Sequence, residues 1–478
     1  MRSAQSAPAG PQSTRFMPWI VAVAMFMLQL DGTIVNTAVP TMAASFQVAS
    51  LSLKSVITSY TIGLAVFIPL SGWVADRFGT RRVFSLAVIV FTLGSLLCGL
   101  SLNLPMLVAS RIIQGAGAAI MLPVGRIALL LTFPKSEMIR IMNYVIVPAL
   151  IGPLLGPVTG GLIVHWMPWR MIFLLNLPFG LLGLYLSHRF MPEHRNPSVG
   201  RFDFRGFLLF GSGVALLSYV LEIFGKHFLP LPAIGAMLVA ALVLMFAYAW
   251  HAQLRRNPLL TLNLFRLRTF RISVVGGFVT RLGISGMPFL LPLLYQIGLG
   301  YTPWQAGLLT MPQAAAAIGM KLCTQPILAR FGHRVILLLN TTLIGLTIMM
   351  FSFVKIGTPV WVILSLSFLQ GCFSALQFTS MNTLTFADTT DAQTSDASTI
   401  ASTAQQLSVS IGVAGASLVT GWFLGGIQRS DSHQLIPALH HAFITLGLLT
   451  ILSSWTFTRL RHNDGDNISN RSQPATGK

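Results

Sequence analysis

The stretch Leu30-Asp31-Gly32-Thr33-Ile34-Val35-Asn36-Thr37-Ala38-Val39-Pro40 closes an apolar run that begins near Met17. At about 1.5 Å per helical residue, this run is long enough to cross a lipid bilayer. Asp31 therefore lies within the depth of the lipid chains, where a charge costs at least about 2.5 kcal/mol unless it faces protein or water. Two roles stay open for it: a structural hydrogen bond to a neighbouring helix, or a protonatable group on a transport path.

The composition shows that the rest of the chain is of the same kind. Of its 478 residues, 54% are hydrophobic and only 9% are charged, which excludes a soluble globular protein. A net charge of +19 would suggest nucleic acid in a soluble protein, but here basic residues crowd the short loops on one side of the predicted membrane. We therefore expect an all-α, polytopic membrane protein that contacts the lipid bilayer and binds no nucleic acid.

Fourteen apolar segments separated by short loops follow one another along the chain. An even number of spans places both termini on one side, and most of the 31 Lys and Arg residues lie in the tails and loops of that side. Because basic loops mark the cytoplasmic side, both termini are expected to be cytoplasmic. The predicted transmembrane helices are 17–39, 52–74, 83–102, 105–128, 141–164, 170–190, 205–225, 231–250, 271–295, 303–325, 334–354, 358–380, 400–425 and 438–458.

The longest basic loops, near 191–204 and 251–270, bracket the pair of spans at 205–250. Without this pair, six spans precede and six follow, which is the pattern of a transporter built from two six-helix halves. The expected organisation is a cytoplasmic tail (1–16), a first six-helix bundle (17–190), two extra helices (205–250), a second six-helix bundle (271–458) and a second cytoplasmic tail (459–478).

A loop rich in glycine and charge, Gly72-Trp73-Val74-Ala75-Asp76-Arg77-Phe78-Gly79-Thr80-Arg81-Arg82, joins the second and third spans. Glycine permits a tight turn, and the charged side chains can pair with helix ends or lipid headgroups. By charge alone this is an ordinary cytoplasmic loop, but the full G-x-x-x-D-R-x-G-x-R-R pattern is far more specific. Its defining residues are Gly72, Asp76, Arg77, Gly79, Arg81 and Arg82.

The fourth span carries Arg111 and Gln114 on one helical face. Counted from the prolines near the ends of their spans, Asp31 and Arg111 both lie roughly 9–14 Å below the outer surface. The two side chains can therefore meet. The alternative is that Arg111 only ties helices together.

The fifth span holds a line of glycines at i+4 steps, with prolines beside them. Such a line lets another backbone approach closely, and the prolines remove hydrogen bonds and kink the helix. Taken alone, this is a packing motif. Its residues are Gly152, Pro153, Gly156, Pro157, Gly160 and Gly161.

Together these patterns resemble the fourteen-span drug:proton antiporter family of the major facilitator superfamily. The glycine line, G-P-x-x-G-P-x-x-G-G, is similar to the antiporter motif that exporters of this superfamily carry and that its uniporters and symporters generally lack. The resemblance implies two six-helix bundles around a central cavity, with the seventh and eighth spans outside them. Further similar stretches are Trp169-Arg170 to Gly180, Phe202-Asp203 to Gly206, Leu264-Phe265-Arg266 to Phe270, and Gln296 to Pro312.

The resemblance implies a proton-coupled secondary active exporter, an antiporter for multidrug efflux in the bacterial inner membrane. Asp31 would alternate between a protonated state and a deprotonated state paired with Arg111. The proton gradient would supply the energy, so no cofactor, metal or catalytic residue is expected, and the protein is expected to act as a monomer. No nucleotide-binding motif is present, and the 12 acids and 10 histidines are scattered singly, which argues against an enzyme.

The class of substrate stays open. The mid-membrane charges are Asp31, Arg111 and Arg281, a slightly positive balance that favours neutral amphiphiles or anions over dications. Arg281 either binds an anionic substrate or tethers two helices, and Asn36 and Gln114 are expected to line the cavity with it. The alternatives to multidrug efflux are export of organic anions or metal-carboxylate complexes such as citrate, and a membrane sensor that keeps the transporter fold without transport.

Overall fold

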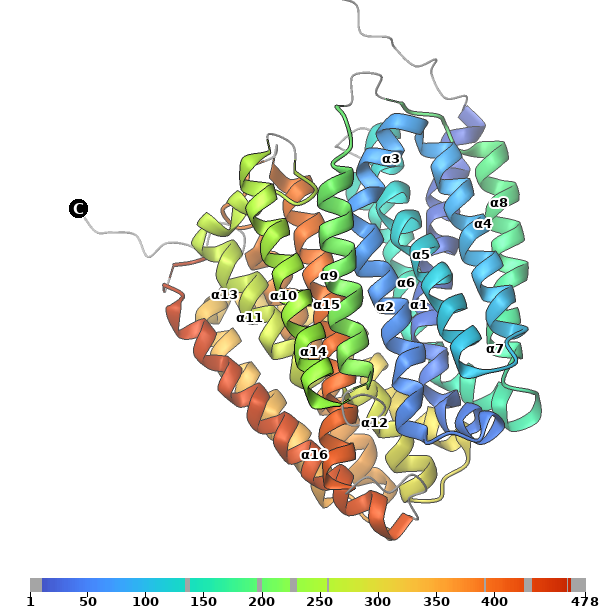
Figure 1. Cartoon of the computed structure of the whole chain (residues 1–478), viewed down its shortest axis with the longest axis vertical. Coiled ribbons are helices and arrows are strands. Elements are labelled where there is room, and N and C mark those ends of the chain that lie inside the picture. Colours follow the sequence, from blue (N-terminus) through green and yellow to red (C-terminus); the bar gives the residue numbers. More distant parts are fainter. Residues whose placement is uncertain are drawn as a thin grey trace, which may run out of the picture.

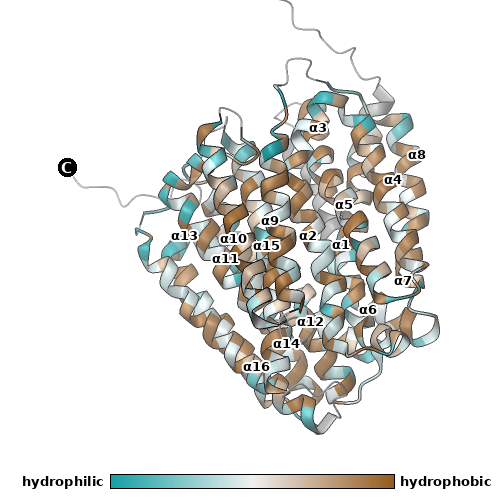
Figure 2. Ribbon diagram, in the orientation of Figure 1, coloured by the Kyte–Doolittle hydropathy of each residue, from teal (hydrophilic) through white to brown (hydrophobic). Residues whose placement is uncertain are grey.

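The computed structural model describes residues 11–133, 138–195, 200–223, 230–255, 258–390, 393–424, 432–461 and 463–465. In this part of the chain the regular elements are all helices, and Figure 1 shows most of them running lengthwise and joined by short connections at their ends. Figure 2 shows hydrophobic residues along the helices and hydrophilic ones concentrated at the end that holds α3. This end is the predicted cytoplasmic end, and the opposite one is the predicted outer end.

Twelve helices of the described ranges are long and apolar enough to cross a membrane, and a shorter apolar helix covers Ile151–Trp166. One of the twelve, Pro303–Phe353, contains two predicted spans that meet at a kink at Gly332. The predicted fourteen spans are therefore consistent with the structure. The prediction of an all-α, polytopic membrane protein is confirmed.

The helices before residue 195 pack together as one group. Asn103 begins one of them, because its side-chain oxygen accepts a hydrogen bond from the Met106 N–H at 2.9 Å and caps the helix. Within the group α1 packs against α6 and α8, and α4 packs against α5. The elements are α1 (Pro11–Phe46), α2 (Lys54–Phe67), α3 (Ser71–Phe78), α4 (Thr80–Gly99), α5 (Leu104–Thr132), α6 (Met138–Trp166), α7 (Met171–Leu174) and α8 (Asn176–Phe190).

A second group follows the hairpin of α9 (Phe204–Ile223) and α10 (Leu231–Leu254). In this group α13 packs against α14 and α16, and α11 packs against α14, α15 and α16. Figure 1 shows α9 between the two groups, and it contacts both α2 and α15. The elements are α11 (Arg268–Ile284), α12 (Met287–Leu293), η5 (Leu294–Gly298), α13 (Pro303–Met350), α14 (Val360–Thr385), α15 (Thr394–Phe423), α16 (Ser432–Ser453) and η8 (Ser454–Arg459).

Two glycines turn the chain between consecutive helices at corresponding places in the two groups. Gly79 has φ +99° between α3 and α4, and Gly332 has φ +75° at the kink in α13. These backbone angles are rarely adopted by residues with a side chain. The second group therefore repeats the turn of the first, although its loop lacks the aspartate.

The two groups are closed against each other at the predicted outer end. The largest hydrophobic cluster packs residues 34–43 of α1 against residues 287–294 of the second group. Two hydrogen bonds join the groups there: the Gln296 side-chain amide donates to the Thr37 carbonyl at 2.8 Å, and the Ser417 hydroxyl donates to the Leu51 carbonyl at 3.2 Å. The structure is therefore that of a state with its outer end shut.

Candidate functional site

Asp31 and Arg111 form an ion pair in the interior of the first group. Asp31 lies at the middle of the apolar span Phe16–Phe46 and has no exposed surface. Arg111 on α5 is 1% exposed, and its Nη1 donates to Asp31 Oδ2 at 2.6 Å. Both charges are removed from water, so each depends on the other and on further hydrogen bonds for its stability.

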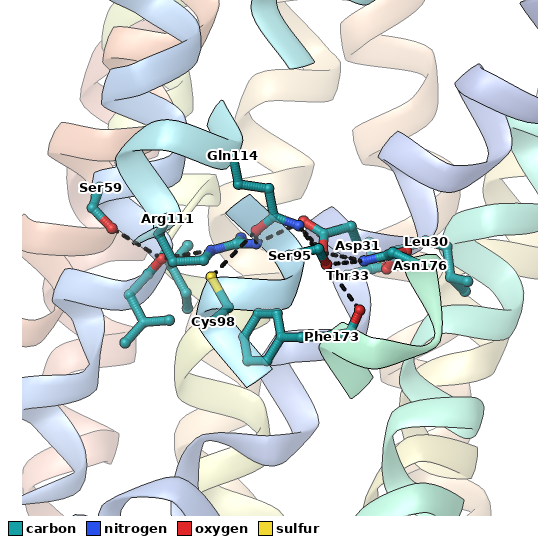
Figure 3. Close-up of polar contacts among 12 residues, drawn as sticks. Leu30, Asp31, Thr33, Ser59, Ser95, Cys98, Arg111, Gln114, Phe173 and Asn176 are labelled. Carbon is teal, nitrogen blue, oxygen red and sulfur yellow. Dashed lines mark hydrogen bonds and ion pairs between the residues drawn. The ribbon is translucent and has the colours of Figure 1, made fainter. Parts of the chain in front are cut away.

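Two side-chain amides complete the coordination of Asp31 (Figure 3). Gln114 on α5 and Asn176 at the start of α8 both donate to Asp31 Oδ1, at 2.9 and 2.8 Å. The same two amides contact the Ser95 hydroxyl of α4, at 3.1 and 3.0 Å. The carboxylate thus accepts three hydrogen bonds and links α1, α4, α5 and α8 through one buried network.

Residues of α2 also contact the Arg111 side chain, in addition to Asp31. Its Nε donates to the Val56 carbonyl at 3.2 Å, and its guanidinium carbon lies 4.1 Å from the centre of the Tyr60 ring. A second Arg111 donor bond runs to Gln114 Oε1 at 2.6 Å. The guanidinium is therefore held by α2 and by Gln114 as well as by Asp31.

The structure places the three predicted cavity residues in different surroundings. Gln114 is 0% exposed and belongs to the ion-pair network. Asn36 is partly buried and lies on one stripe of α1 with Gln29 and Gly32, both exposed. A Cβ at Gly32 would have no atom within 4 Å, so this stripe borders open space. Arg281 lies on α11 in the second group and takes no part in the network around Asp31.

Asn176, Ser95 and Tyr60 were not predicted as site residues. Ser95 and Asn176 are single polar groups in apolar stretches, which is the signal that could have identified them, because such groups seek partners inside a membrane. Tyr60 follows Thr58 and Ser59, so the sequence around it carries no such signal. Which of them would meet Asp31 depends on how the helices pack. The described residues contain no cluster of three His, Cys, Asp or Glu side chains that could hold a metal ion.

The glycine-rich, charged loop from Gly72 to Arg82 contacts the segment that follows α8. Glu193 of this segment lies 3.4 Å from Arg81 Nε and 3.9 Å from Arg82 Nε. Arg195 Nε donates to the Arg77 carbonyl at 2.9 Å, and Gly79 forms the turn into α4. Gly72 and Asp76 are partly buried on α3. The loop thus binds the first group to the chain that leads out of it.

The glycines of the antiporter motif bring α6 onto the helix that carries Asp31. A Cβ at Gly152 would lie 2.8 Å from Gln29 Cβ, and one at Gly156 would lie 2.9 Å from Thr33 Cβ and overlap its hydroxyl. Gly160 meets Ile34 and Thr37 in the same way. Pro153 and Pro157 lie between these glycines inside α6. Close packing of α6 therefore fixes the position of α1 on both sides of Asp31.

Gly161 points to the other group. A Cβ there would lie 2.7 Å from Trp304 Cα and would overlap the Pro303 carbonyl. Reciprocally, a Cβ at Gly307 of α13 would lie 2.9 Å from the Pro157 carbonyl carbon. Backbone therefore meets backbone where α6 and α13 close the outer end.

Gly156→Ala is expected to destabilise the protein by about 1–3 kcal/mol, because the new methyl group overlaps Thr33 inside a packed interface. Unfolding in mixed micelles measures the change. The matched control is Gly235→Ala in α10, where a Cβ meets nothing within 4 Å. Adding Thr33→Ala to Gly156→Ala should restore part of the loss. Equal stability of the two alanine variants would contradict close packing of α6 on α1.

Comparisons with known proteins agree with this architecture. The chain is 38% identical over 469 residues to "Putative multidrug resistance protein MdtD" of Serratia proteamaculans, covering 97% of both chains. It is also 38% identical to the protein of that name from Escherichia coli O81, over 96% of this chain and 97% of the relative.

Solved structures show the same fold at low sequence identity. A mutant of the nucleoside transporter NupG is 12% identical with a TM-score of 0.66, over 92% of this chain and 99% of that one. The human organic anion transporter MFSD10 (TETRAN) is 16% identical with a TM-score of 0.59, over 93% and 99%. The family model of the Major Facilitator Superfamily matches residues 21–413. The chain therefore belongs to the major facilitator superfamily and is a membrane transporter, not an enzyme.

Proposed function

We propose that this transporter is a proton-coupled exporter of small molecules, with Asp31 as the group that carries the proton. The observation behind the proposal is the fully buried ion pair of Asp31 with Arg111 at 2.6 Å in the middle of a membrane span. An intramembrane acid is costly and is retained mostly where protons or ligands bind. The curated relatives bear the name of a multidrug resistance protein, which supports efflux as the direction.

Protonation of Asp31 changes the force between α1 and α5. A neutral carboxyl group keeps some hydrogen bonds but loses the attraction of the Arg111 charge, which is strong in a medium of low dielectric constant. On the same helix, Thr37 accepts the hydrogen bond from Gln296 of the second group at 2.8 Å. A shift of α1 on proton binding would therefore act directly on the closed outer end, which is the coupling that an antiporter requires.

Complete burial of Asp31 also suits an antiporter. A carboxylate open to both sides at once would leak protons across the membrane, whereas Asp31 has no exposed surface while the outer end is closed. Exchange of its proton then requires the network to open. Alternating access of a buried site is how secondary transporters couple two fluxes.

The polar stripe of α1 is the proposed contact for substrate in the first group. Gln29 and Gly32 are exposed and Asn36 is partly exposed, although all three lie in a membrane span. These groups carry no charge, so the first group offers hydrogen bonds to a neutral amphiphile. The excess of basic residues on one side supports a location of both termini in the cytoplasm. The bacterial origin of the relatives supports the inner membrane as the location.

Reconstitution tests the proposed function. Purified protein in liposomes with a trapped pH-sensitive dye should release internal protons when a neutral amphiphile such as chloramphenicol is exchanged against a proton gradient. Substrate counterflow without any gradient serves as the control for transport itself. Counterflow without proton movement would replace antiport by facilitated diffusion. Absence of counterflow for a broad panel would favour the sensor hypothesis.

A further inference from the structure

Arg281 is a buried arginine for which the described residues provide no opposite charge. It lies near the middle of the span Arg268–Gly298, in the last turn of α11, and is 5% exposed. Its Nε is buried and has no hydrogen-bond partner. The described contact of its guanidinium is the face of the Phe378 ring, at 5.0 Å from the ring centre.

A comparison with the first group shows that the second group lacks a charged residue at the position equivalent to Arg111. On α5 the sequence Arg111-Ile112-Ile113-Gln114-Gly115 places a guanidinium opposite the acid of α1. On α14 the sequence Ser367-Phe368-Leu369-Gln370-Gly371 occupies the equivalent place, since Gly115 and Gly371 both pack against the backbone of a neighbouring helix, at Gly63 and Gln313. Ser367 thus stands where the first group has a charge.

The consequence is a difference in net charge between the two groups at mid-membrane. In the first, Asp31 and Arg111 neutralise each other. In the second, the first long helix carries Arg281, and Ser367 is neutral and contacts only the Tyr295 hydroxyl, at 3.4 Å, among its described side-chain partners. A guanidinium buried without a counter-charge is strongly unfavourable. Its charge can be balanced by an anion that enters from outside the protein.

A small cavity next to Arg281 offers the place for such an anion. Its volume is about 10 Å³, and it is lined by Ser273, Val274 and Arg281 of α11, Met381, Asn382 and Thr385 of α14, and Ala401 and Ala404 of α15. This volume can hold about one water molecule or one oxygen atom of a ligand. Hydroxyl and amide groups face it, and no acidic residue lines it. Asn382 is exposed, so the cavity is not sealed on that side.

We propose that Arg281 and this cavity form an anion subsite that takes the carboxylate of an organic acid. The planar guanidinium can donate two parallel hydrogen bonds to a carboxylate, and one oxygen fits the cavity. The ring of Phe378, which is partly exposed beside the guanidinium, contacts the apolar body of the acid. Within the proposed export function, on which this inference rests for its transport role, the substrate class becomes amphiphilic carboxylates.

Benzoate and its neutral analogue benzamide test the subsite without any proton gradient. With purified protein in nanodiscs, benzoate should raise the thermal unfolding midpoint in a saturable manner, and benzamide should not. Arg281→Gln should weaken the response to benzoate at least about tenfold, because a charged hydrogen bond is lost. Arg281→Lys should retain part of it, since the charge remains but the planar fork is lost. The matched control is Arg126→Gln, an exposed arginine of α5.

A second variant keeps the test decisive if Arg281→Gln does not fold. Ala404→Asp places a carboxylate in the cavity, so it should abolish benzoate binding and raise the unfolding midpoint of the unliganded protein. Equal benzoate responses of the wild type and both cavity variants would overturn the subsite, as would the absence of any response in the wild type. Asp31→Asn should still bind benzoate. Binding without proton-driven export would leave the subsite standing and refute the proposed function.

Discussion

Asp31→Asn is expected to abolish proton-driven export. The amide has nearly the shape of the carboxylate but cannot bind or release a proton. The variant would therefore hold α1 in a single charge state, and a proton gradient could no longer drive the change between open states. Vesicles that contain the variant should show no substrate accumulation above the background of vesicles without the protein, at equal amounts of inserted protein.

The same change also leaves the Arg111 guanidinium without its counter-charge. Removing one partner of a buried ion pair typically costs about 3–5 kcal/mol, and here Gln114, Asn176 and Ser95 would compensate for only part of it. The double variant Asp31→Asn with Arg111→Gln removes both charges. It should recover stability relative to the single variant while transport stays absent, and unfolding curves of both variants measure this difference.

Asp31→Glu is the matched control, because it keeps a titratable group in the same network. It should retain measurable proton-driven export, reduced by the extra methylene in a packed site. Full gradient-driven export by Asp31→Asn would rule out Asp31 as the proton carrier. The pair with Arg111 would then be only structural.

Gly161→Leu is expected to slow the transport cycle strongly while the protein still inserts and folds. Gly161 does not pack inside its own group but against the backbone of Pro303 and Trp304 in the other group, where a Cβ finds no room. A leucine there opposes closure of the outer end by about 1–3 kcal/mol, which changes the balance of two states by about 5–150-fold. Export should fall by a similar factor.

The accessibility of single cysteines at the outer end checks this prediction. In the Gly161→Leu protein a cysteine placed at Ser417, a buried residue that contacts Leu51 of the first group, should react faster with a water-soluble thiol reagent than in the parent protein. Gly235→Leu is the control, because a Cβ there meets no atom within 4 Å. Normal export by Gly161→Leu would show that the close contact of α6 with α13 is not needed in the cycle.

The sequence allowed the meeting of Asp31 with Arg111 to be predicted because depth in a membrane can be counted along each span. The sequence does not show in the same way which helices lie beside one another at that depth. Asn176 donates to Asp31 across a separation of 145 residues, and its choice of partner depends on the packing of α8 against α1. For the same reason the burial of Gln114 in the network could not be derived from its helical face alone.

The glycines of α6 show a second limit. The sequence presents Gly152, Gly156, Gly160 and Gly161 as one close-packing motif. In the structure the first three meet α1, whereas Gly161 meets α13, because one residue turns the direction of a side chain by about 100° around the helix. Packing within a group and closure between groups are therefore separated by a single residue step, which only the placement of both neighbours reveals.

The ion pair also sets an order of events during biogenesis. Asp31 and Arg111 are separated by 80 residues, so at about 5–20 residues per second the acid is synthesised about 4–16 s before its partner. Asn176 follows later still. Throughout this interval the nascent first span carries a charge without a partner. Such a span is more stable in contact with water or protein than in the lipid phase. The first helix therefore gains its counter-charge only after α5, the fourth predicted span, has been made.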